Sequence, residues 1–152
     1  MIHQSISEFN YSLRVKVRFQ EVDMLNVCNN VTYITYFEES RLGYLANLGL
    51  IPENGVFSDG LLNFIVRNEI NYFAHAKYAD ELNIYARISY LKYSSFGFEH
   101  LVENNKTKEI IADGKGVIVF VDPKTEKSTK MPDEFRRKVL NFEKNVRIFE
   151  RE

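Results

Sequence analysis

The chain has 152 residues, of which 45% are hydrophobic and 27% charged, a balance that is ordinary for one globular domain and excludes a disordered protein. The net charge is −1 at pH 7, so no overall field favours nucleic acid or an anionic membrane as a partner. No apolar run reaches the roughly 18 residues of a membrane span. Cys28 is the only cysteine, and the first ten residues lack the pattern of a secretion signal, so we expect a reducing, cytoplasmic location.

The first predicted element is a strand over residues 12–19. Its apolar positions, which are expected to share one face, are Leu13, Val15, Val17 and Phe19. Polar residues stand between them, and strict alternation of this kind is typical of a strand with one buried and one solvent-exposed face.

A long helix is predicted over residues 30–48, after a loop over residues 20–29. Its recurring positions are Val31, Ile34, Phe37 or Glu38, Leu42, Leu45 and Leu48. They follow three- and four-residue steps, Gly49 is a suitable residue to end the helix, and Asn29 or Asn30 is a suitable cap for its start. Three tyrosines widen the apolar surface, so we expect the rest of the fold to enclose most of the helix.

Four more strands are expected, after a loop over residues 52–60. They cover residues 62–73, 81–91, 95–103 and 109–121. The strand over residues 81–91 alternates well, and the residues expected on one of its faces are Leu82, Ile84, Ala86, Ile88 and Tyr90. Short polar links such as residues 104–107 predict hairpins.

The C-terminal segment is predicted to form a short helix. Residues 122–125, Asp-Pro-Lys-Thr, end the last strand, and Pro132 fits the first turn of a helix that carries Phe135, Val139 and Phe142. The order of elements favours an α+β fold in which a curved antiparallel sheet wraps around the one long helix. We find no repeat or linker, and residues 1–152 are therefore expected to form a single domain.

The most informative position is Asp23, seven residues before Asn30 at the predicted start of the long helix. Free backbone N–H groups at a helix N-terminus, together with the helix dipole, can polarise a carbonyl oxygen. A nearby carboxylate can attack that carbonyl or deprotonate a water molecule. This arrangement suits acyl transfer, whereas the structural alternative is that Asp23 is only a turn or capping residue.

A longer motif surrounds Asp23. It consists of Asp23, Asn26, Cys28, Asn30, Tyr33, Tyr36–Phe37, Glu38 and Arg41. In order and spacing it resembles the motif of the hot-dog-fold thioesterases of the 4-hydroxybenzoyl-CoA thioesterase family, and the likeness extends over about residues 13–138. The resemblance implies the hot-dog fold, in which the curved sheet wraps around the central helix.

The resemblance also implies an activity, which is hydrolysis of acyl-CoA or of an acyl group on the pantetheine arm of an acyl carrier protein. Asp23 would be the nucleophile or general base, and the N–H of Asn30 would help to form the oxyanion site. No cofactor is needed. The family builds its active site between two subunits, so we expect a homodimer or homotetramer.

Two features of the motif keep other functions open. The family's usual glycine is Asn26 here, and Val27 and Asn30 occupy places where many members have histidine. A dehydratase of the same fold would need a histidine beside its aspartate, so the sequence disfavours that activity. A non-catalytic acyl-CoA-binding or regulatory module remains the main alternative. The apolar composition does not decide between an aromatic, a short and a long acyl group.

Further residues are weaker candidates for substrate contacts. Lys92, Ser94 and Ser95 offer a cation and hydroxyl donors for a phosphate, although ordinary solvent-exposed surface also explains the lysine. Tyr33 and Val66 are candidate pocket residues, although core packing explains them equally well.

The remaining ionisable candidates are expected to be structural. Glu38 is expected to pair with Arg41 or with a buried partner, and is an alternative base; Cys28 is expected to be a small buried residue. His75 and His100 are expected to be structural or solvated, and their spacing predicts no metal site.

Overall fold

The structure is a computed structural model that describes residues 6–51 and 62–149. Its strands and helices, in chain order, are β1 (Tyr11–Lys16), α1 (Thr32–Asn47), β2 (Leu62–Tyr72), β3 (Glu81–Leu91), β4 (Ser95–Asn104), β5 (Ile110–Val121), α2 (Asp133–Phe142) and β6 (Arg147–Ile148). The two short 3-10 helices are η1 (Ile6–Glu8) and η2 (Phe19–Glu21). The loop predicted over residues 52–60 lies outside the described residues.

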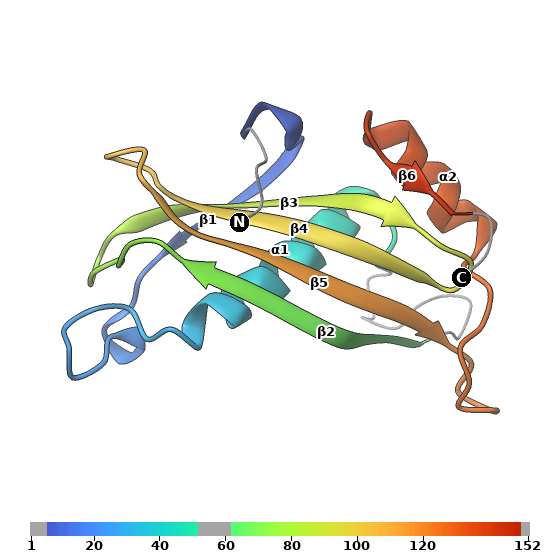
Figure 1. Ribbon diagram of the computed structural model, residues 1–152, viewed down its shortest axis with the longest axis horizontal. Helices are drawn as coiled ribbons and strands as arrows, with labels where there is room; N and C mark the ends of the chain where they lie inside the picture. The colour runs from blue at the N-terminus through green and yellow to red at the C-terminus, as the bar shows by residue number, and fades with distance from the viewer. Residues whose placement is uncertain (1–5, 52–61, 150–152) are drawn as a thin grey trace.

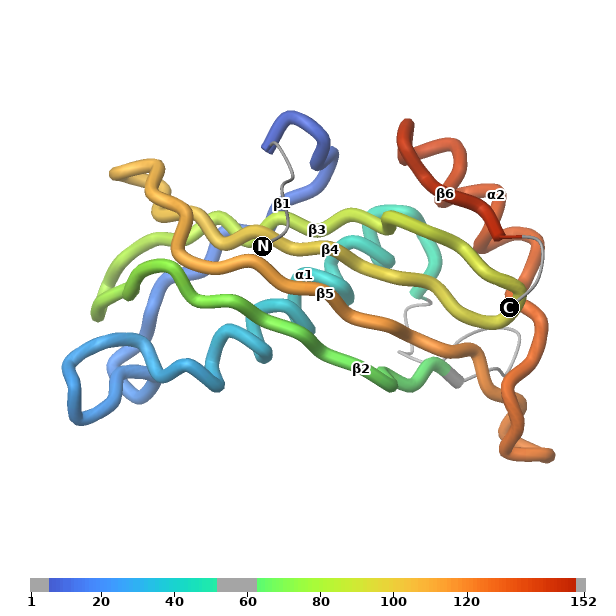
Figure 2. Tube along the Cα trace, viewed as in Figure 1, coloured from blue at the N-terminus to red at the C-terminus, as the bar shows by residue number. Residues whose placement is uncertain are grey.

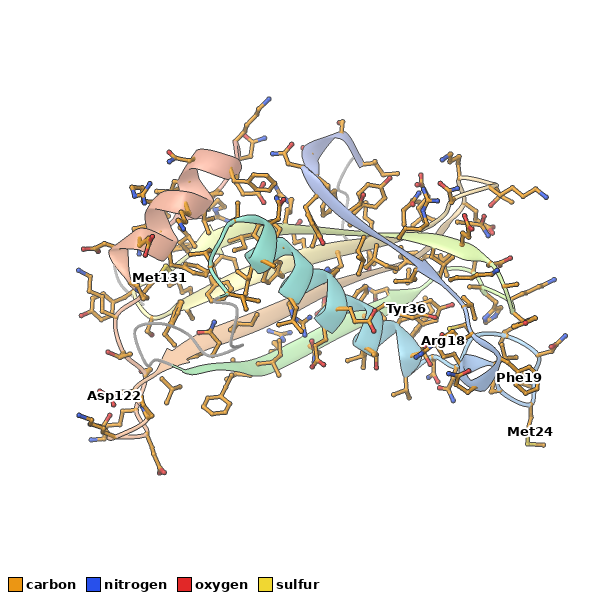
Figure 3. All side chains as sticks on the ribbon, turned by 180° about the vertical axis from the view of Figure 1, so that it is seen from behind. Arg18, Phe19, Met24, Tyr36, Asp122 and Met131 are labelled. Carbon is orange, nitrogen blue, oxygen red and sulfur yellow. The ribbon has the colours of Figure 1, made fainter. Side chains whose placement is uncertain are left out.

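The strands form one curved sheet in the order β1-β3-β4-β5-β2, with antiparallel neighbours throughout (Figure 1). β6 pairs in parallel with the last residues of β3, beyond the stretch of β3 that pairs with β1. β3, β4 and β5 pass in front of α1 in Figure 1, and α1 lies in front of these strands in Figure 3, which is seen from behind. The predicted hot-dog architecture is therefore confirmed.

α1 packs on the sheet through residues that match the predicted set only in Phe37 and Leu45. The buried residues of the helix are Tyr33, Tyr36, Phe37, Ser40, Arg41, Tyr44 and Leu45. Val31 and Leu42, which the predicted stripe included, are 63% and 53% exposed. The helix is buried on its tyrosine-bearing face and exposed on the opposite one, so the prediction that the fold encloses most of the helix is met only in part in the described chain.

The first strand is shorter than predicted. β1 ends at Lys16, and Val17 bonds instead to the segment before β3, where its N–H donates to the carbonyl of Asp80. The chain then turns into η2, which leaves Phe19 80% exposed. Leu13, Val15 and Val17 do share the inner face, but Phe19 does not, because the alternation stops where the strand stops.

A β-bulge changes the direction of the side chains near the end of β3. Leu82, Ile84, Ala86 and Ile88 are fully buried on the inner face, as predicted. The register with β4 shifts between Ile88 and Tyr90, so that Leu91 points inward and the ring of Tyr90 lies over Gly97 on the outer face. The prediction that Tyr90 shares the inner face is wrong, because one extra residue reverses the alternation.

The predicted turns are confirmed. Gly49 adopts a left-handed conformation (φ 69°) after α1, and its N–H bonds to the carbonyl of Ala46. The side chain of Asn104 accepts bonds from two backbone N–H groups in the β4–β5 hairpin. Pro132 caps the start of α2, whereas β6 was not predicted. No helix in the described part of the chain is long and apolar enough to cross a membrane.

The core lies between α1 and the inner face of the sheet. Its central contact is the stack of the Phe37 ring on the imidazole of His100, with centroids 4.4 Å apart and an interplanar angle of 7°. Gly114 of β5 lies beneath Phe37, where a Cβ atom would overlap the ring. A glycine is therefore required at this position to let the helix approach the strand closely.

Candidate active site

Asp23 lies in a tight loop between Val22 and Cys28, which form an isolated antiparallel bridge. The N–H of Asp23 donates to the carbonyl of Val27 (3.0 Å), and the carbonyl of Asp23 accepts from the N–H of Asn26 (3.0 Å). Asn26 takes up the left-handed conformation (φ 65°), which asparagine tolerates better than most residues. Asn26 thus performs the conformational role of the glycine that the family motif has here.

The side chain of Asp23 is half-buried, and only one of its carboxylate oxygens accepts a hydrogen bond in the described structure. Its Oδ1 accepts a hydrogen bond from the N–H of Leu25 (2.8 Å), which is a local turn of the kind that aspartate often makes. No group in the described part of the chain donates to Oδ2 or forms an ion pair with the carboxylate. One carboxylate oxygen therefore fixes the loop, and the other is left for a ligand or a water molecule.

Glu21 anchors the base of the loop, and the sequence did not single it out. Its buried carboxylate accepts bonds from the backbone N–H of Arg18 (2.9 Å), from the Arg18 guanidinium (3.2 Å) and from the hydroxyl of Tyr36 (2.9 Å). Burial acts to raise the pKa of Glu21, but these donors outweigh it, so the pKa lies below its ordinary value. Glu21 is therefore an ionised structural group.

The start of α1 leaves the backbone amide of Asn30 without a partner in the described structure. Asn29 accepts hydrogen bonds from two backbone N–H groups. Its Oδ1 accepts from the N–H of Val31 (2.9 Å), and its carbonyl accepts from the N–H of Thr32 (2.9 Å). The helix begins at Thr32, two residues after the predicted start, and the Asn29 side chain bonds to its N-cap residue, Val31. The N–H of Asn30 donates to no other group in residues 6–51 or 62–149. An unsatisfied, exposed amide at this point can donate to an incoming oxygen.

Tyr72 of β2 and Tyr33 of α1 support this helix start. The Tyr72 hydroxyl donates to the carbonyl of Asn30 (2.7 Å), and the rings of the two tyrosines meet edge to face, with centroids 5.7 Å apart. Tyr33 itself is buried, and its hydroxyl accepts from the N–H of Ala76 (3.2 Å). Burial raises the pKa of Tyr33, so its hydroxyl is neutral at physiological pH.

The other ionisable candidates near the loop differ in burial. Cys28 is buried, and burial raises the pKa of its thiol, as expected for a small packing residue. Glu38 is exposed, and it forms no ion pair with the buried Arg41 in the described structure, so the predicted pairing is wrong. His75 is exposed in a loop, whereas His100 is fully buried.

The environment of His100 keeps it uncharged. Its Nδ1 lies 3.1 Å from the carbonyl of Tyr85, which can only accept, so Nδ1 carries the proton. Burial, with a further contribution from the positive charge of Arg41, lowers the pKa of His100 to about 3. The described residues contain no group of three or more His, Cys, Asp or Glu side chains arranged to hold a metal.

The residues predicted to contact substrate do not gather around Asp23 within one chain. Lys92, Ser94 and Ser95 form the turn between β3 and β4, where Ser94 and Ser95 are buried and the N–H of Lys92 donates to the carbonyl of Ser95 (2.8 Å). Figure 2 shows the loop that contains Asp23 and the C-terminal end of β5 at opposite ends of the sheet. In Figure 3 Met24 marks the first end, and Met131, whose N–H bonds to the carbonyl of Tyr93, marks the second.

Val66 lies between these two ends, at a bulge in β2. β2 is the last strand of the sheet on its side, and Val66 is 60% exposed. The other large apolar residues exposed on β2 are Phe64, Ile65 and Tyr72. A long, exposed, apolar edge strand is a template for pairing with another chain.

The chain is similar in sequence to known thioesterases. Residues 17–139 match the model of the thioesterase-like superfamily. A protein of Bacillus subtilis, YsmA, is 30% identical over 135 residues, which cover 89% of this chain and 88% of YsmA. The chloroplastic acyl-acyl carrier protein thioesterase ATL3 of Arabidopsis thaliana is 27% identical over 139 residues, which cover 91% of this chain and 72% of ATL3.

A solved structure from Thermus thermophilus, a thioesterase complexed with coenzyme A and zinc, superposes with a TM-score of 0.76 and is 27% identical. The superposition covers 90% of this chain and 96% of the Thermus chain. The match to the family model covers most of the sequence, and the fold agrees with it. The chain therefore belongs to the thioesterase-like superfamily and is a thioester hydrolase with the hot-dog fold.

Proposed function

We propose that this enzyme hydrolyses acyl thioesters of coenzyme A or of an acyl carrier protein, with Asp23 as the catalytic carboxylate and the N–H of Asn30 as an oxyanion donor. The observation that carries the proposal is that the free Oδ2 of Asp23 and the unsatisfied amide of Asn30 belong to the same end of the sheet, where α1 begins.

The reaction follows from these two groups. With Asp23 as general base, its carboxylate takes a proton from water while the water oxygen bonds to the thioester carbon. The carbonyl oxygen gains the negative charge, which the N–H of Asn30 stabilises. As the carbonyl re-forms, the C–S bond breaks and the thiolate takes the proton from Asp23, which yields a carboxylic acid and a thiol. With Asp23 as nucleophile, its carboxylate bonds to the thioester carbon and the C–S bond breaks, which gives an anhydride and a thiolate; water then hydrolyses the anhydride to the acid, regenerates the Asp23 carboxylate and supplies the proton for the thiolate.

Two chains are needed to complete the site. The Tyr72–Asn30 hydrogen bond lies at the C-terminal end of β2, whereas Phe64, near its N-terminal end, pairs with Val119, which pairs in turn with Ser95. If two copies join antiparallel along β2, each Asn30 lies beside the N-terminal end of the partner's β2. The Asp23 loop of one protomer then faces the end of the partner that carries the β3–β4 turn.

This pairing supports the roles proposed for the remaining residues. Val66 would line the acyl site at the joint between the strands, and Lys92, Ser94 and Ser95 would contact the phosphate-bearing arm of the substrate. Tyr33 would define the floor beside α1 through its ring contact with Tyr72. We accordingly propose a homodimer or a homotetramer made of single-domain protomers in the cytoplasm, a reducing compartment that suits the buried free thiol of Cys28.

The relatives support both kinds of carrier. ATL3 is named as an acyl-acyl carrier protein thioesterase, and the Thermus structure contains coenzyme A. A third relative, from Escherichia coli, is named as a long-chain acyl-CoA thioesterase, and it is 25% identical over 126 residues. The common chemistry is an acyl group on a pantetheine thiol, and we propose that as the substrate class.

Thiol release from a panel of acyl-CoA and acyl carrier protein thioesters tests the proposal, with Asp23→Asn as the decisive variant. Asparagine keeps an Oδ1 that accepts from Leu25, so the loop is preserved while the base is lost. We expect kcat to fall at least about 100-fold with binding retained. Unchanged turnover in Asp23→Asn would show that Asp23 is only a turn residue. Binding without turnover in the wild type would identify a non-catalytic module.

A single turnover in water labelled with oxygen-18 tests the nucleophilic mechanism. When water attacks the Asp23 carbon of the anhydride, the label enters Asp23, and mass spectrometry of the peptide that contains Asp23 detects it. A general base directs the label only into the acid product.

A further inference from the structure

The buried side-chain nitrogen and oxygen atoms that have no hydrogen-bond partner in the described structure belong to three residues. They are Nη1 of Arg41 on α1, both amide atoms of Asn63 on β2, and Nε2 of His100 on β4. Nearly all buried polar groups in proteins are satisfied, so each exception calls for an explanation. None of the three belongs to the proposed catalytic pair, Asp23 and Asn30.

Arg41 is the clearest of these exceptions, because its charge is unpaired as well. The residue is 6% exposed, and within residues 6–51 and 62–149 it forms no ion pair and no side-chain hydrogen bond. Burial lowers the pKa of Arg41, against the charge of Glu38, but a guanidinium remains protonated in proteins. A buried charge without a counter-ion costs free energy. The positive charge of Arg41 therefore points to an anionic ligand.

The guanidinium of Arg41 lies just behind the edge of the sheet that β2 forms. Its Nη1 would be 3.5 Å from a Cβ atom placed on Gly116, and the Cδ1 of Ile65 would be 3.2 Å from the same point. Ile65 directly precedes Val66 at the β2 bulge, and these two residues are 42% and 60% exposed. Arg41 is therefore one side chain away from the exposed edge at which Val66 is proposed to line the acyl site.

The groups around Arg41 favour a carboxylate as the anion. A guanidinium presents parallel N–H groups that match the two oxygens of a carboxylate. Asn63 lies two residues before Ile65 on the inner face of β2, opposite the buried Phe120, and its unsatisfied amide offers a further N–H donor. His100 is uncharged, so it neither repels the anion nor pairs with it. One positive charge with amide donors nearby suits a ligand group with a single negative charge.

The distance between Arg41 and the start of α1 limits the length of the acyl group. The thioester carbonyl is proposed to lie at Asn30, and Arg41 is about 14 Å beyond Thr32 along the helix, at a rise of about 1.5 Å per residue. We infer that Arg41 determines substrate specificity by binding a carboxylate at the far end of a medium or long acyl chain, so that the preferred substrates are thioesters of dicarboxylic acids. The inference rests on the proposed hydrolysis at Asp23 and narrows its substrate class.

Thiol release from acyl-CoA pairs of equal chain length tests the inference, with decanedioyl-CoA against decanoyl-CoA and dodecanedioyl-CoA against dodecanoyl-CoA. We expect kcat/KM in the wild type to be at least about tenfold higher for the dicarboxylic member of each pair. In Arg41→Met this ratio should fall at least about tenfold, and Arg41→Lys, which keeps the charge but not the parallel N–H groups, should give an intermediate ratio. The control is Arg137→Met, at an exposed position of α2, which should keep the wild-type ratio. A wild-type ratio of one or less at both lengths, or an unchanged ratio in Arg41→Met, would overturn the inference.

Binding measurements separate this inference from the proposed hydrolysis. In Asp23→Asn, which is expected to bind without turnover, calorimetric titration should show at least about tenfold tighter binding of dodecanedioyl-CoA than of dodecanoyl-CoA. Equal affinities would overturn the role of Arg41 even where hydrolysis is confirmed. A wild type that keeps this preference but releases no thiol would contradict the hydrolysis and support the role of Arg41. If 12-hydroxydodecanoyl-CoA binds as tightly as dodecanedioyl-CoA, the assignment to a carboxylate is wrong.

Discussion

The hydroxyl of Tyr72, on the edge strand β2, donates a 2.7 Å hydrogen bond to the carbonyl of Asn30 at the entrance to α1. The bond links two proposed parts of the enzyme. β2 is the strand along which we propose that protomers pair, and the N–H of Asn30 is the proposed oxyanion donor. The position of that amide therefore depends on a strand that is distant from it in sequence.

Replacing Tyr72 by phenylalanine tests this dependence. The variant loses a hydrogen bond, and we expect the free energy of unfolding to fall by about 1 kcal/mol. We expect kcat/KM for thiol release to fall by roughly three- to tenfold, since small displacements of a catalytic donor reduce the rate. Tyr78→Phe is the control, because Tyr78 is exposed and makes only a ring contact with Phe19. Equal kinetics in both variants would contradict the role assigned to the bond.

A lysine at Val66 tests the pairing of protomers along β2. Val66 is 60% exposed in the single chain, so the substitution should leave the stability of the protomer within about 0.5 kcal/mol. A charge on the edge strand opposes strand pairing, and we expect analytical ultracentrifugation to show monomers with little remaining activity. Tyr78→Lys should remain oligomeric and active. An inactive Val66→Lys variant that still sediments as the wild type would show that Val66 acts in the substrate pocket and not in assembly.

His100 should make stability depend on pH. Its pKa is about 3 in the folded protein and 6.5 ordinarily, so between these values the unfolded chain binds the extra proton. The stabilising contribution is complete above pH 6.5 and decreases as the pH falls, by about 2 kcal/mol between pH 6.5 and pH 5. Urea unfolding across this range should show the slope in the wild type and in His75→Gln, but not in His100→Phe. A slope that persists in His100→Phe would assign the effect to another group.

Gly114→Ala tests the close approach of α1 to β5. The added Cβ would overlap the ring of Phe37, which cannot move freely because it is stacked on His100, and it would lie 3.0 Å from the carbonyl oxygen of Glu69. We expect a loss of about 1–3 kcal/mol. Gly116→Ala is the matched control on the same strand, since its nearest neighbour is the flexible Cδ1 of Ile65 at 3.2 Å. Thermal unfolding of both variants should show the larger decrease in Tm for Gly114→Ala.

The fold was largely predictable because its patterns are local. Alternation identified β3 to within one residue, and Gly49 marked the end of α1. The buried face of α1 was wrongly predicted, because weighting branched residues over tyrosines selected Val31 and Leu42. That choice depends on which face meets the sheet, and such information lies in the tertiary structure rather than in the periodicity.

The candidate site was predictable only in part. Asp23 and Asn30 follow from their spacing and from the family motif, but Glu21 was missed, although its spacing from Arg18 is a local signal for their ion pair. β6 was not predictable, because its two residues show no alternation.

The bulge in β3 changes which positions of the strand face the core, and therefore which substitutions the strand tolerates. Before residue 89, even-numbered positions face the core and will accept few substitutions, whereas after it the odd-numbered Leu91 occupies the core. Deletion of Ser89 would leave a regular ladder in which Tyr90 stays opposite Gly97 and Leu91 opposite Phe96, each on its present face. If Ser89 instead joined the ladder as an ordinary strand residue, Tyr90 would enter a space that fits leucine and the outer face would lose an aromatic ring, so one backbone insertion couples the packing of the interior to the composition of the opposite surface.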